Sequence, residues 1–588
     1  MDRRRFLQAA GSFSLLGARA RAADGRTRPS DAAWPSKKSW DRLRDAVDGN
    51  LAPLESPFAA GASWQDLLPE LRNPYYLGEH PALTENLGWV GAWTSKPSAY
   101  AVAAKSAGHI AAAVDFAREH NLRLVVKGGG HSYQGTSNAP DSLLVWTRHL
   151  NDIAMHSAFV PQGCDGAVQS QPAVTLGSGN IWMHAYEAVT TQAGRYVQGG
   201  GCTTVGVAGL IQSGGFGSFS KRYGLAAAGL LEAEVVTADG KVRIANARTN
   251  PDLFWALKGG GGGTFGAMSK LTLRVRELPE SFGGAIFSVK AASDEAYRSL
   301  LRRFLAFYKD HLCNQHWGEQ ARVHGGNTLG IQMVFAGLDS QEANRAWKPF
   351  LDWVGASRGL YQLQGPPVIA ALPARNWWNP EFMNRVHPGA FAADPRPGAP
   401  AGNAWWTGDG GQAAQVLYGF ESLWLPAALL EGDAQDRLAN ALFEGSRHWD
   451  IELHFNKGLA GAPPDAVRDA ADTATNPSVL TAFALAIVAG GQGPAYPGIR
   501  GHEPDQAAAA KAVRGIARSM GELRRLAPDG GSYVSESNFF ERDWQHSYWG
   551  GNYPRLAAVK KKYDPAGLFF VHNGVGSEAW SGDGFTRR

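Results

Sequence analysis

The 588-residue chain has few cysteines, no long run of basic residues and no long apolar run. Its three cysteines are too few for a disulfide scaffold or for a structural zinc site built on paired cysteines. The 57 basic and 53 acidic residues are spread along the chain and leave a net charge of +4, which provides no basic patch for nucleic acid. No segment approaches the ~20 apolar residues that span a bilayer. We therefore expect no nucleic-acid partner, no membrane anchor and no metal site.

Glycine, in contrast, is abundant, with 72 residues in the chain. This is well above the typical share of ~7%, and no collagen-like period accompanies it. Local glycine clusters must therefore explain the excess. The chain also exceeds the ~250–300 residues at which a single core stops growing, so we expect at least two domains.

The N-terminus has the pattern of an export signal. Adjacent arginines at Arg3 and Arg4 precede Phe6 and Leu7, and a short, weakly apolar stretch follows. Small residues around 18–22 offer cleavage sites. The segment resembles a twin-arginine signal peptide, which hands folded proteins to the Tat export machinery. We predict a signal peptide over 1–22 and a periplasmic or secreted protein.

The first half of the chain alternates strands with glycine-rich loops. Helical periodicity over 107–120 precedes a strand over 122–126, which runs directly into glycines 128–130. Strand patterns over 230–237 and 241–244 flank Asp239-Gly240 and predict a hairpin. Five consecutive glycines at 259–263 precede a strand over 271–275.

The second half has a different texture. Helical patterns over 294–311, 339–354 and 504–526 alternate with strand patterns over 451–455 and 483–488. Asp339 followed by Glu342 is a capping-box signature. The predicted divisions are a signal at 1–22, an N-terminal extension at 23–94, a first domain at 95–278, a second α+β domain at 279–530 and a C-terminal segment at 531–588.

The glycine loops suggest anion binding. A strand that feeds Lys127-Gly128-Gly129-Gly130 exposes main-chain N–H groups that can form a nest for a pyrophosphate. The loop matches neither a Walker A sequence nor the Rossmann spacing. A plain surface turn is the alternative interpretation.

Three further motifs together make the chain resemble a known family. They are the Cys202-Thr203-Thr204-Val205-Gly206 loop, Asn552-Tyr553 near the C-terminus, and the 252–257 segment that precedes the five glycines. With Gly129-Gly130-His131, these motifs resemble the berberine-bridge-enzyme-like members of the vanillyl-alcohol-oxidase superfamily. The resemblance implies an α+β fold in which a two-part, PCMH-type FAD-binding domain accompanies a substrate domain with an antiparallel sheet backed by helices.

The resemblance also implies how the cofactor is held. His131 would bond the flavin 8α-methyl group and Cys202 would bond flavin carbon 6, so that FAD is held by two covalent bonds. Both bonds withdraw electron density from the ring and favour hydride acceptance. Further cofactor contacts are expected from the glycine loops and the C-terminal motif: Lys127, Gly128, Gly129, Gly130, Ser132, Val205, Gly206, Gly209, Gly214, Gly215, Asn552 and Tyr553.

Several positions depart from the family pattern. Lys127 stands where arginine is usual, Gln134 where glutamate is common, and Leu210 and Ser213 replace histidine and glycine. These changes affect fine contacts and leave both attachment residues in place. Val205 resembles the small residue of the oxygen-reactive members.

The catalytic base is less evident from the sequence. Hydride transfer from a carbon that bears a hydroxyl or amine requires a group that accepts the heteroatom proton. The strand at 483–488, where the family often places this group, has no carboxylate. The candidates lie on the segment that returns to the flavin: Tyr533, Glu536, His546 and Tyr548.

Three other features bear on the substrate and on covalent structure. The doublets Trp377-Trp378 and Trp405-Trp406 are interpreted as ligand-stacking loops or, equally, as core packing. Alternation places Glu452 and His454 on one strand face. Cys164 and Cys313 remain available for a disulfide in an oxidising compartment.

The predicted activity is that of an FAD-linked oxidase. A hydride would move from an alcohol carbon of a sugar, oligosaccharide or other hydroxylated small molecule to FAD, and electrons would pass to dioxygen to give hydrogen peroxide. Three alternatives stay open: a dehydrogenase with another electron acceptor, an amine or alkaloid-type oxidase, and a flavin-free periplasmic carbohydrate-binding protein.

Overall fold

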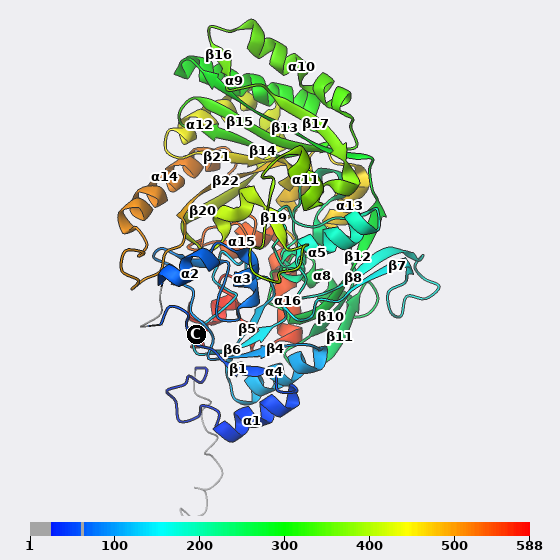
Figure 1. Cartoon of the computed structure of the whole chain (residues 1–588), viewed down its shortest axis with the longest axis vertical. Helices are drawn as coiled ribbons and strands as arrows, with labels where there is room; N and C mark the ends of the chain where they lie inside the picture. Colours follow the sequence, from blue (N-terminus) through cyan, green and yellow to red (C-terminus); the bar gives the residue numbers. More distant parts are fainter. Residues whose placement is uncertain (1–24, 60–63) are drawn as a thin grey trace, which may run out of the picture.

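The computed structural model describes residues 25–59 and 64–588, which form three large sheets with flanking helices (Figure 1). The predicted signal peptide at 1–22 lies outside the described residues. Within the described residues, no helix is long and apolar enough to cross a bilayer.

A four-stranded sheet begins the first domain. Its order is β1-β4-β6-β5, and β4, β6 and β5 run parallel. Helices α1 and α4 pack on it through Trp40, Val114 and other buried side chains. The bounds are β1 (Leu51–Pro53), β4 (Tyr100–Ala103), β5 (Arg123–Lys127), β6 (Ser142–Trp146), α1 (Lys37–Ala46) and α4 (Ala107–Glu119).

The second sheet is antiparallel and completes this domain. Its order is β11-β10-β12-β8-β7, with β9 paired to β12. The predicted hairpin is confirmed, because Val236 on β10 pairs with Val242 on β11 across the Asp239-Gly240 turn. The bounds are β7 (Ile153–Phe159), β8 (Gln171–Gly177), β9 (Arg195–Val197), β10 (Leu230–Val236), β11 (Val242–Asn246) and β12 (Ala267–Glu277).

A ten-stranded sheet dominates the second half of the chain. Its order is β16-β13-β15-β14-β21-β22-β20-β2-β3, with β17 paired to β13. The bounds are β2 (Asn86–Trp89), β3 (Trp93–Thr94), β13 (Ser281–Ala291), β14 (Trp317–His324), β15 (Thr328–Ala336), β16 (Tyr361–Leu363), β17 (Val368–Pro373), β20 (Gln415–Pro426), β21 (Ile451–His454) and β22 (Ala482–Gln492).

Four helices cover one face of this sheet, and their apolar side chains share a core with alternate strand residues such as Phe287, Val323 and Leu453. The helices are α9 (Asp294–Phe307), α10 (Ser340–Ala356), α12 (Gly432–Ser446) and α14 (Gln506–Arg524). Helix α10 begins with the predicted capping box, since Asp339 and Glu342 each accept the other's backbone N–H. The opposite face of the sheet is left for a cavity.

Two features of the structure bear on the sequence analysis. Part of the predicted N-terminal extension joins the sheet of the second half, because β2 pairs in parallel with β20 and extends an otherwise antiparallel sheet. The thiols of Cys164 and Cys313 are free: one lies beside Asn246 and the other beside the carbonyl of Ala460. A disulfide between them is therefore wrong.

The C-terminal segment returns to the first domain. It contains the short helices α15 (Trp544–Trp549) and α16 (Tyr553–Tyr563). Phe569 bridges to Leu124 on β5, and Thr586 bridges to Gly25. In Figure 1 the C-terminus accordingly lies beside the four-stranded sheet. The C-terminal residues thus lie beside both Gly25 and strand β5 of the first domain.

Candidate active site

A cavity of about 1250 Å³ lies between the first domain and the uncovered face of the ten-stranded sheet. It is larger than the ~300–1,000 Å³ usual for small-molecule sites, so it has room for a large cofactor together with a substrate. Its walls come from the glycine loops at 128–132, 201–209 and 261–263, from strands β14, β21 and β22, and from residues 533–536.

Two glycine loops meet main chain to main chain at the floor of this cavity. A Cβ atom added to Gly129 would lie 2.7 Å from the backbone nitrogen of Gly206, and one added to Gly206 would lie 2.7 Å from the nitrogen of Gly129. Strand β5 carries the first loop, while Gly206 begins helix α6 (Val207–Gln212). This contact brings His131 and Cys202 into one cavity wall.

His131 is buried as a neutral imidazole. Burial lowers its pKa to about 4, and its Nε2 lies 3.2 Å from the Thr204 hydroxyl oxygen. Because a neutral imidazole keeps a lone pair on one ring nitrogen, it can act as a nucleophile or ligand at ordinary pH.

Cys202 has two polar partners. Its Sγ donates to Oδ1 of Asp409 at 3.4 Å and accepts from Nε2 of Gln412 at 3.5 Å. Burial, followed by the negative charge of Asp409, raises the pKa of the thiol well above its ordinary value. The thiol is therefore protonated at neutral pH.

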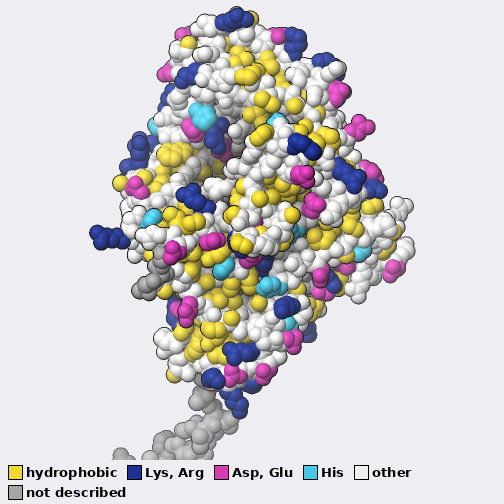
Figure 2. Space-filling model, in the orientation of Figure 1, with side chains coloured by type: hydrophobic (Ala, Val, Ile, Leu, Met, Phe, Trp, Pro, Cys, Tyr) yellow, Lys and Arg dark blue, Asp and Glu magenta, His cyan; other side chains and the backbone are white. Residues whose placement is uncertain are grey.

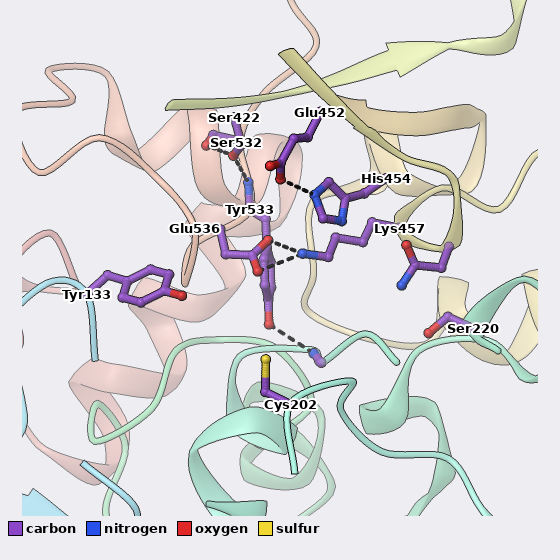
Figure 3. Close-up of polar contacts among 12 residues, drawn as sticks. Tyr133, Cys202, Ser220, Ser422, Glu452, His454, Lys457, Ser532, Tyr533 and Glu536 are labelled. Carbon is purple, nitrogen blue, oxygen red and sulfur yellow. Dashed lines mark hydrogen bonds and ion pairs between the residues drawn. The ribbon is translucent and has the colours of Figure 1, made fainter. Parts of the chain in front are cut away.

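Two of the predicted catalytic residues extend into the cavity from the C-terminal segment (Figure 3). The Tyr533 hydroxyl points toward Cys202 and accepts the backbone N–H of Gly215 at 3.3 Å. Burial, and then the charge of Glu536, raises the pKa of this phenol. Both oxygens of the Glu536 carboxylate accept hydrogen bonds from the Lys457 ammonium, and the distance to Oε1 is 2.6 Å.

A second pair, seen only in part from the sequence, faces the same space. His454 Nε2 lies 3.1 Å from Oε2 of Glu452, and Arg322 on β14 binds the other carboxylate oxygen. Alternation correctly placed Glu452 and His454 on one strand face, and the sheet shows that this face lines the cavity. The Glu452 carboxylate is placed to hold the His454 imidazole in one orientation, as a hydrogen-bonded third residue does for the base of a catalytic triad.

The comparisons with known proteins agree with this geometry. The family described as FAD binding domain matches residues 97–246, and the one described as Berberine and berberine like matches residues 532–576. Over 95% of its length, the chain is 30% identical to the VAO-type flavoprotein oxidase VAO615 of Thermothelomyces thermophilus, of which it covers 94%. The chain belongs to the VAO and berberine-bridge family of FAD-linked oxidoreductases.

Solved structures support the fold. The VAO-type flavoprotein MtVAO615 from Myceliophthora thermophila C1 is 27% identical, with a TM-score of 0.75 over 96% of this chain and 100% of that one. Glucooligosaccharide oxidase from Acremonium strictum, a protein with a 6-S-cysteinyl, 8α-N1-histidyl FAD, is 19% identical, with a TM-score of 0.66 over 91% of this chain and 99% of that one. The family and fold expected from the motifs are thereby confirmed.

The cavity wall fits FAD. Several buried polar atoms that line it have no partner among the described residues, and an unsatisfied buried group costs about 1–3 kcal/mol. These atoms are Gln134 Oε1, Ser178 Oγ, Gln212 Oε1, Thr264 Oγ1 and Asp409 Oδ2. A polar ligand that spans the glycine loops would satisfy them. Across residues 25–59 and 64–588, no cluster of three His, Cys, Asp or Glu side chains could hold a metal ion.

Most of the expected cofactor residues do line the cavity. Besides His131 and Cys202, they are Gly128, Gly129, Gly130, Ser132, Val205, Gly206 and Gly209. Lys127 also lines the cavity, and its ammonium donates to the carbonyls of Pro81 and Leu83 at 2.6 and 2.8 Å. Burial lowers its pKa to about 7.

Gly214 and Gly215 lie outside the cavity lining. Their backbones have φ of +101° and +73°, and an added Cβ would meet Thr475 or Leu210. Glycine is needed here for a turn and for close packing. A direct cofactor contact by these two residues is not supported.

Asn552 and Tyr553 of the C-terminal motif also lie outside the cavity lining. Asn552 donates to the carbonyl of Thr475 at 2.9 Å, and the Tyr553 hydroxyl donates to Glu578 at 2.7 Å. Both contacts fix the path of the returning segment. The flavin or substrate contacts expected of Asn552 and Tyr553 are not supported.

The remaining catalytic candidates differ in position. Tyr548 lines the cavity, but its hydroxyl donates to the carbonyl of Asn538 at 3.2 Å, and burial raises its pKa. His546 is exposed on α15 and is absent from the cavity wall. A catalytic role for His546 is therefore not supported, because the short helix directs Tyr548 inward and leaves His546 exposed.

The tryptophan doublets at 377–378 and 405–406 contain both core-packing rings and rings that face the cavity. Trp378 and Trp405 are buried in the core, with 4% and 7% of their surface exposed. The less buried Trp377 and Trp406 line the cavity with ring centroids 6.0 Å apart, and Trp378 also contributes to its wall. One ring of each doublet is therefore available to a ligand.

Proposed function

We propose that this enzyme is an oxidase that removes a hydride from an alcohol carbon of a hydroxylated substrate and holds FAD through His131 and Cys202. The observation that carries the proposal is the contact between the two glycine loops, which places a neutral imidazole and a thiol in the wall of one cavity. When bound, FAD accepts the hydride at its N5 position.

Peptide mapping tests the two attachments. The purified protein is precipitated with acid and digested, and the peptides containing His131 and Cys202 are examined by mass spectrometry. One flavin that links both peptides is expected, and His131→Ala should leave it on Cys202 alone. Flavin that is fully released by acid from the unmodified protein would contradict covalent attachment.

Tyr533 is the proposed acceptor of the substrate proton. In flavin, carbon 6 is separated from N5 by a single ring carbon, so the groups around Cys202 would surround the expected place of hydride transfer. The Tyr533 hydroxyl points toward Cys202 (Figure 3). His454, oriented by Glu452, is the rival acceptor.

The substrate is proposed to be a sugar, an oligosaccharide or another hydroxylated compound. Trp377 and Trp406 offer apolar rings on which a sugar face can stack, while Lys457, Glu536 and His454 offer hydrogen bonds. A carbohydrate oxidase from Microdochium nivale shares the fold at 20% identity and a TM-score of 0.64. Assays on sugars, aromatic alcohols and amines separate this proposal from an amine or alkaloid-type oxidase.

Dioxygen is the proposed electron acceptor. The relative VAO615 is named an oxidase, and the small Val205 side chain lines the cavity beside the Cys202 loop. Turnover should consume oxygen and release an equal amount of hydrogen peroxide. Reduction of a dye without oxygen uptake would favour the dehydrogenase alternative.

Export by the twin-arginine route is proposed from residues 1–22 alone. Replacement of Arg3 and Arg4 by lysine should retain the protein in the cytoplasm of a bacterial host with an active Tat system. Equal periplasmic amounts of the variant and the unmodified chain would refute this route.

A further inference from the structure

The thiol of Cys202 is enclosed by side chains from one distant turn. Asp409 and Gln412 both belong to the 3-10 segment η5 (Thr407–Gln412), which follows β19 (Ala404–Trp406). Asp409 Oδ1 accepts from the sulfur at 3.4 Å, and Gln412 Nε2 donates to it at 3.5 Å. The sulfur thus has a group that can accept its proton on one side. On the other side it has a hydrogen-bond donor that can stabilise the negative charge of a thiolate.

Asp409 has the features of a proton acceptor. Its carboxyl group is buried and lines the cavity, and Oδ2 has no hydrogen-bond partner among the described residues. None of the ion pairs found in that part of the chain includes it. Burial raises its pKa to about 6, so the carboxylate is ionised at neutral pH and is ready to take a proton. A buried carboxylate kept without a cation beside a nucleophile indicates a chemical role.

Gln412 is held in the orientation that donates to sulfur. The Tyr133 hydroxyl lies 3.4 Å from Gln412 Oε1, which leaves the amide NH₂ directed at Sγ. The positive charge of Lys457 also lowers the pKa of the thiol, although burial outweighs it. Without a base, the thiol of Cys202 would stay protonated and would be a poor nucleophile.

We propose that Asp409 is the general base that removes the Cys202 proton when the thioether to flavin carbon 6 forms. The inference rests on the proposed bicovalent attachment. The sulfur electron pair forms the S–C6 bond, and the thiol proton moves to Asp409 Oδ1. The hydrogen on carbon 6 leaves as a proton, and its bonding pair stays on the flavin, which is thereby reduced by two electrons. Dioxygen is the oxidant that restores the oxidised flavin, with formation of hydrogen peroxide.

The test is Asp409→Asn, which keeps the shape of the side chain but removes its ability to accept the proton. Glu319→Gln is the matched control, because Glu319 is another acidic residue of the cavity wall that has no contact with Sγ. Its negative charge raises the pKa of Asp409, so its removal leaves the Asp409 carboxylate ionised at neutral pH. Each variant is produced with riboflavin-replete cells, precipitated with acid and alkylated with iodoacetamide. Mass spectrometry then gives the fraction of His131 peptides and the fraction of Cys202 peptides that carry flavin.

The ratio of the two attachments is the readout, so only folded protein with bound flavin contributes to it. In Asp409→Asn, the flavin should stay on His131, while the Cys202 attachment falls at least ~100-fold in rate, the usual contribution of a general base. The Cys202 peptide should then be alkylated. Glu319→Gln should match the unmodified protein. Asp409→Glu, which restores a carboxylate, should recover the thioether in part.

Other outcomes overturn the proposal in distinguishable ways. A normal Cys202 attachment in Asp409→Asn shows that Asp409 is not the base, while the bicovalent function stands. An equal loss in Glu319→Gln shows a general charge effect. An unmodified enzyme without flavin on Cys202 refutes the bicovalent attachment itself and this inference with it.

Discussion

At the scale of single residues, burial decides which groups carry charge in this enzyme. The same loss of water lowers the pKa of His131 and raises those of Cys202 and Tyr533. All three groups are therefore neutral near pH 7, as is suitable for a site that must hold an uncharged ring. The charges of the site include the pairs Lys457–Glu536 and Arg322–Glu452 and the Asp409 carboxylate beside Cys202.

Tyr533→Phe tests the proton acceptor at this scale. The turnover number should fall by ~10²–10⁴-fold with covalent flavin retained, because the phenol oxygen is the lost group. Since burial raises its pKa, activity of the unmodified enzyme should still be rising with pH at the alkaline end of the stable range. His454→Gln serves as the comparison. A larger loss in that variant, together with an unchanged alkaline limb in Tyr533→Phe, would assign the role to His454.

Glu85 provides a test of stability against pH. It is fully buried, its Oε2 has no partner among the described residues, and burial raises its pKa to about 8. The folded state therefore binds this proton more tightly than the unfolded state, whose carboxyl pKa is near the ordinary 4.5. Stability contributed by the protonated form is complete below pH ~4.5 and is lost as pH rises to ~8.

Glu85→Gln should therefore raise the free energy of unfolding at pH 8 by a few kcal/mol. Each unit by which the folded-state pKa exceeds the unfolded-state pKa corresponds to about 1.4 kcal/mol. At pH 5 it should change little. Urea unfolding at both pH values measures the difference. An equal effect at pH 5 and pH 8 would mean that the carboxyl is not titrating in this window.

At the scale of elements, the glycine loops at 128–130 and 201–206 are short connections that hold His131 and Cys202 close together because their main chains touch. The first loop continues from the strand that the sequence predicted over 122–126, but the approach of Gly129 to Gly206 joins parts of the chain 77 positions apart. The strand and its glycines were evident from the pattern, whereas the neighbour that excludes a Cβ was not. The tight approach explains why both positions are glycine.

Gly129→Ala should separate these loops. The added methyl group would lie 2.7 Å from a backbone nitrogen that cannot move alone, and overpacking of this kind costs about 1–3 kcal/mol. A lower melting temperature and a reduced fraction of bicovalent flavin are expected. Gly355→Ala on α10 is the control, because nothing lies within 4 Å of its added Cβ. Full attachment in Gly129→Ala would show that the loops can yield without consequence.

At the scale of the whole molecule, the ten-stranded sheet forms one cavity wall and is continuous with the N-terminal extension through β2 and β20. Figure 2 shows acidic and basic side chains interspersed over the face drawn, with no field of one sign.

Trp89→Ala tests the continuity of this sheet. Trp89 lies on β2 with 2% of its surface exposed, and truncation of a buried aromatic costs about 3–5 kcal/mol. The variant should have a lower melting temperature than the unmodified protein, in the transition in which the ten-stranded sheet unfolds. Differential scanning calorimetry and flavin fluorescence measure this transition. Phe540→Ala, at a residue that is 55% exposed, should leave the melting temperature almost unchanged. A Trp89→Ala variant that melts like the Phe540 control would mean that β2 is dispensable.

The amino-acid sequence by itself determined the local elements and the family. Helices α4 and α10, the β10–β11 hairpin and the glycine loops follow from periodicity, caps and turns, which act over a few residues. The placement of Asp409 and Gln412 beside Cys202, and of Arg322 beside Glu452, was decided only by the tertiary structure. So were the outward position of His546 and the capture of the Lys127 ammonium by carbonyls. These contacts join residues far apart in the chain, and they form only when burial of apolar surface brings distant strands and loops together.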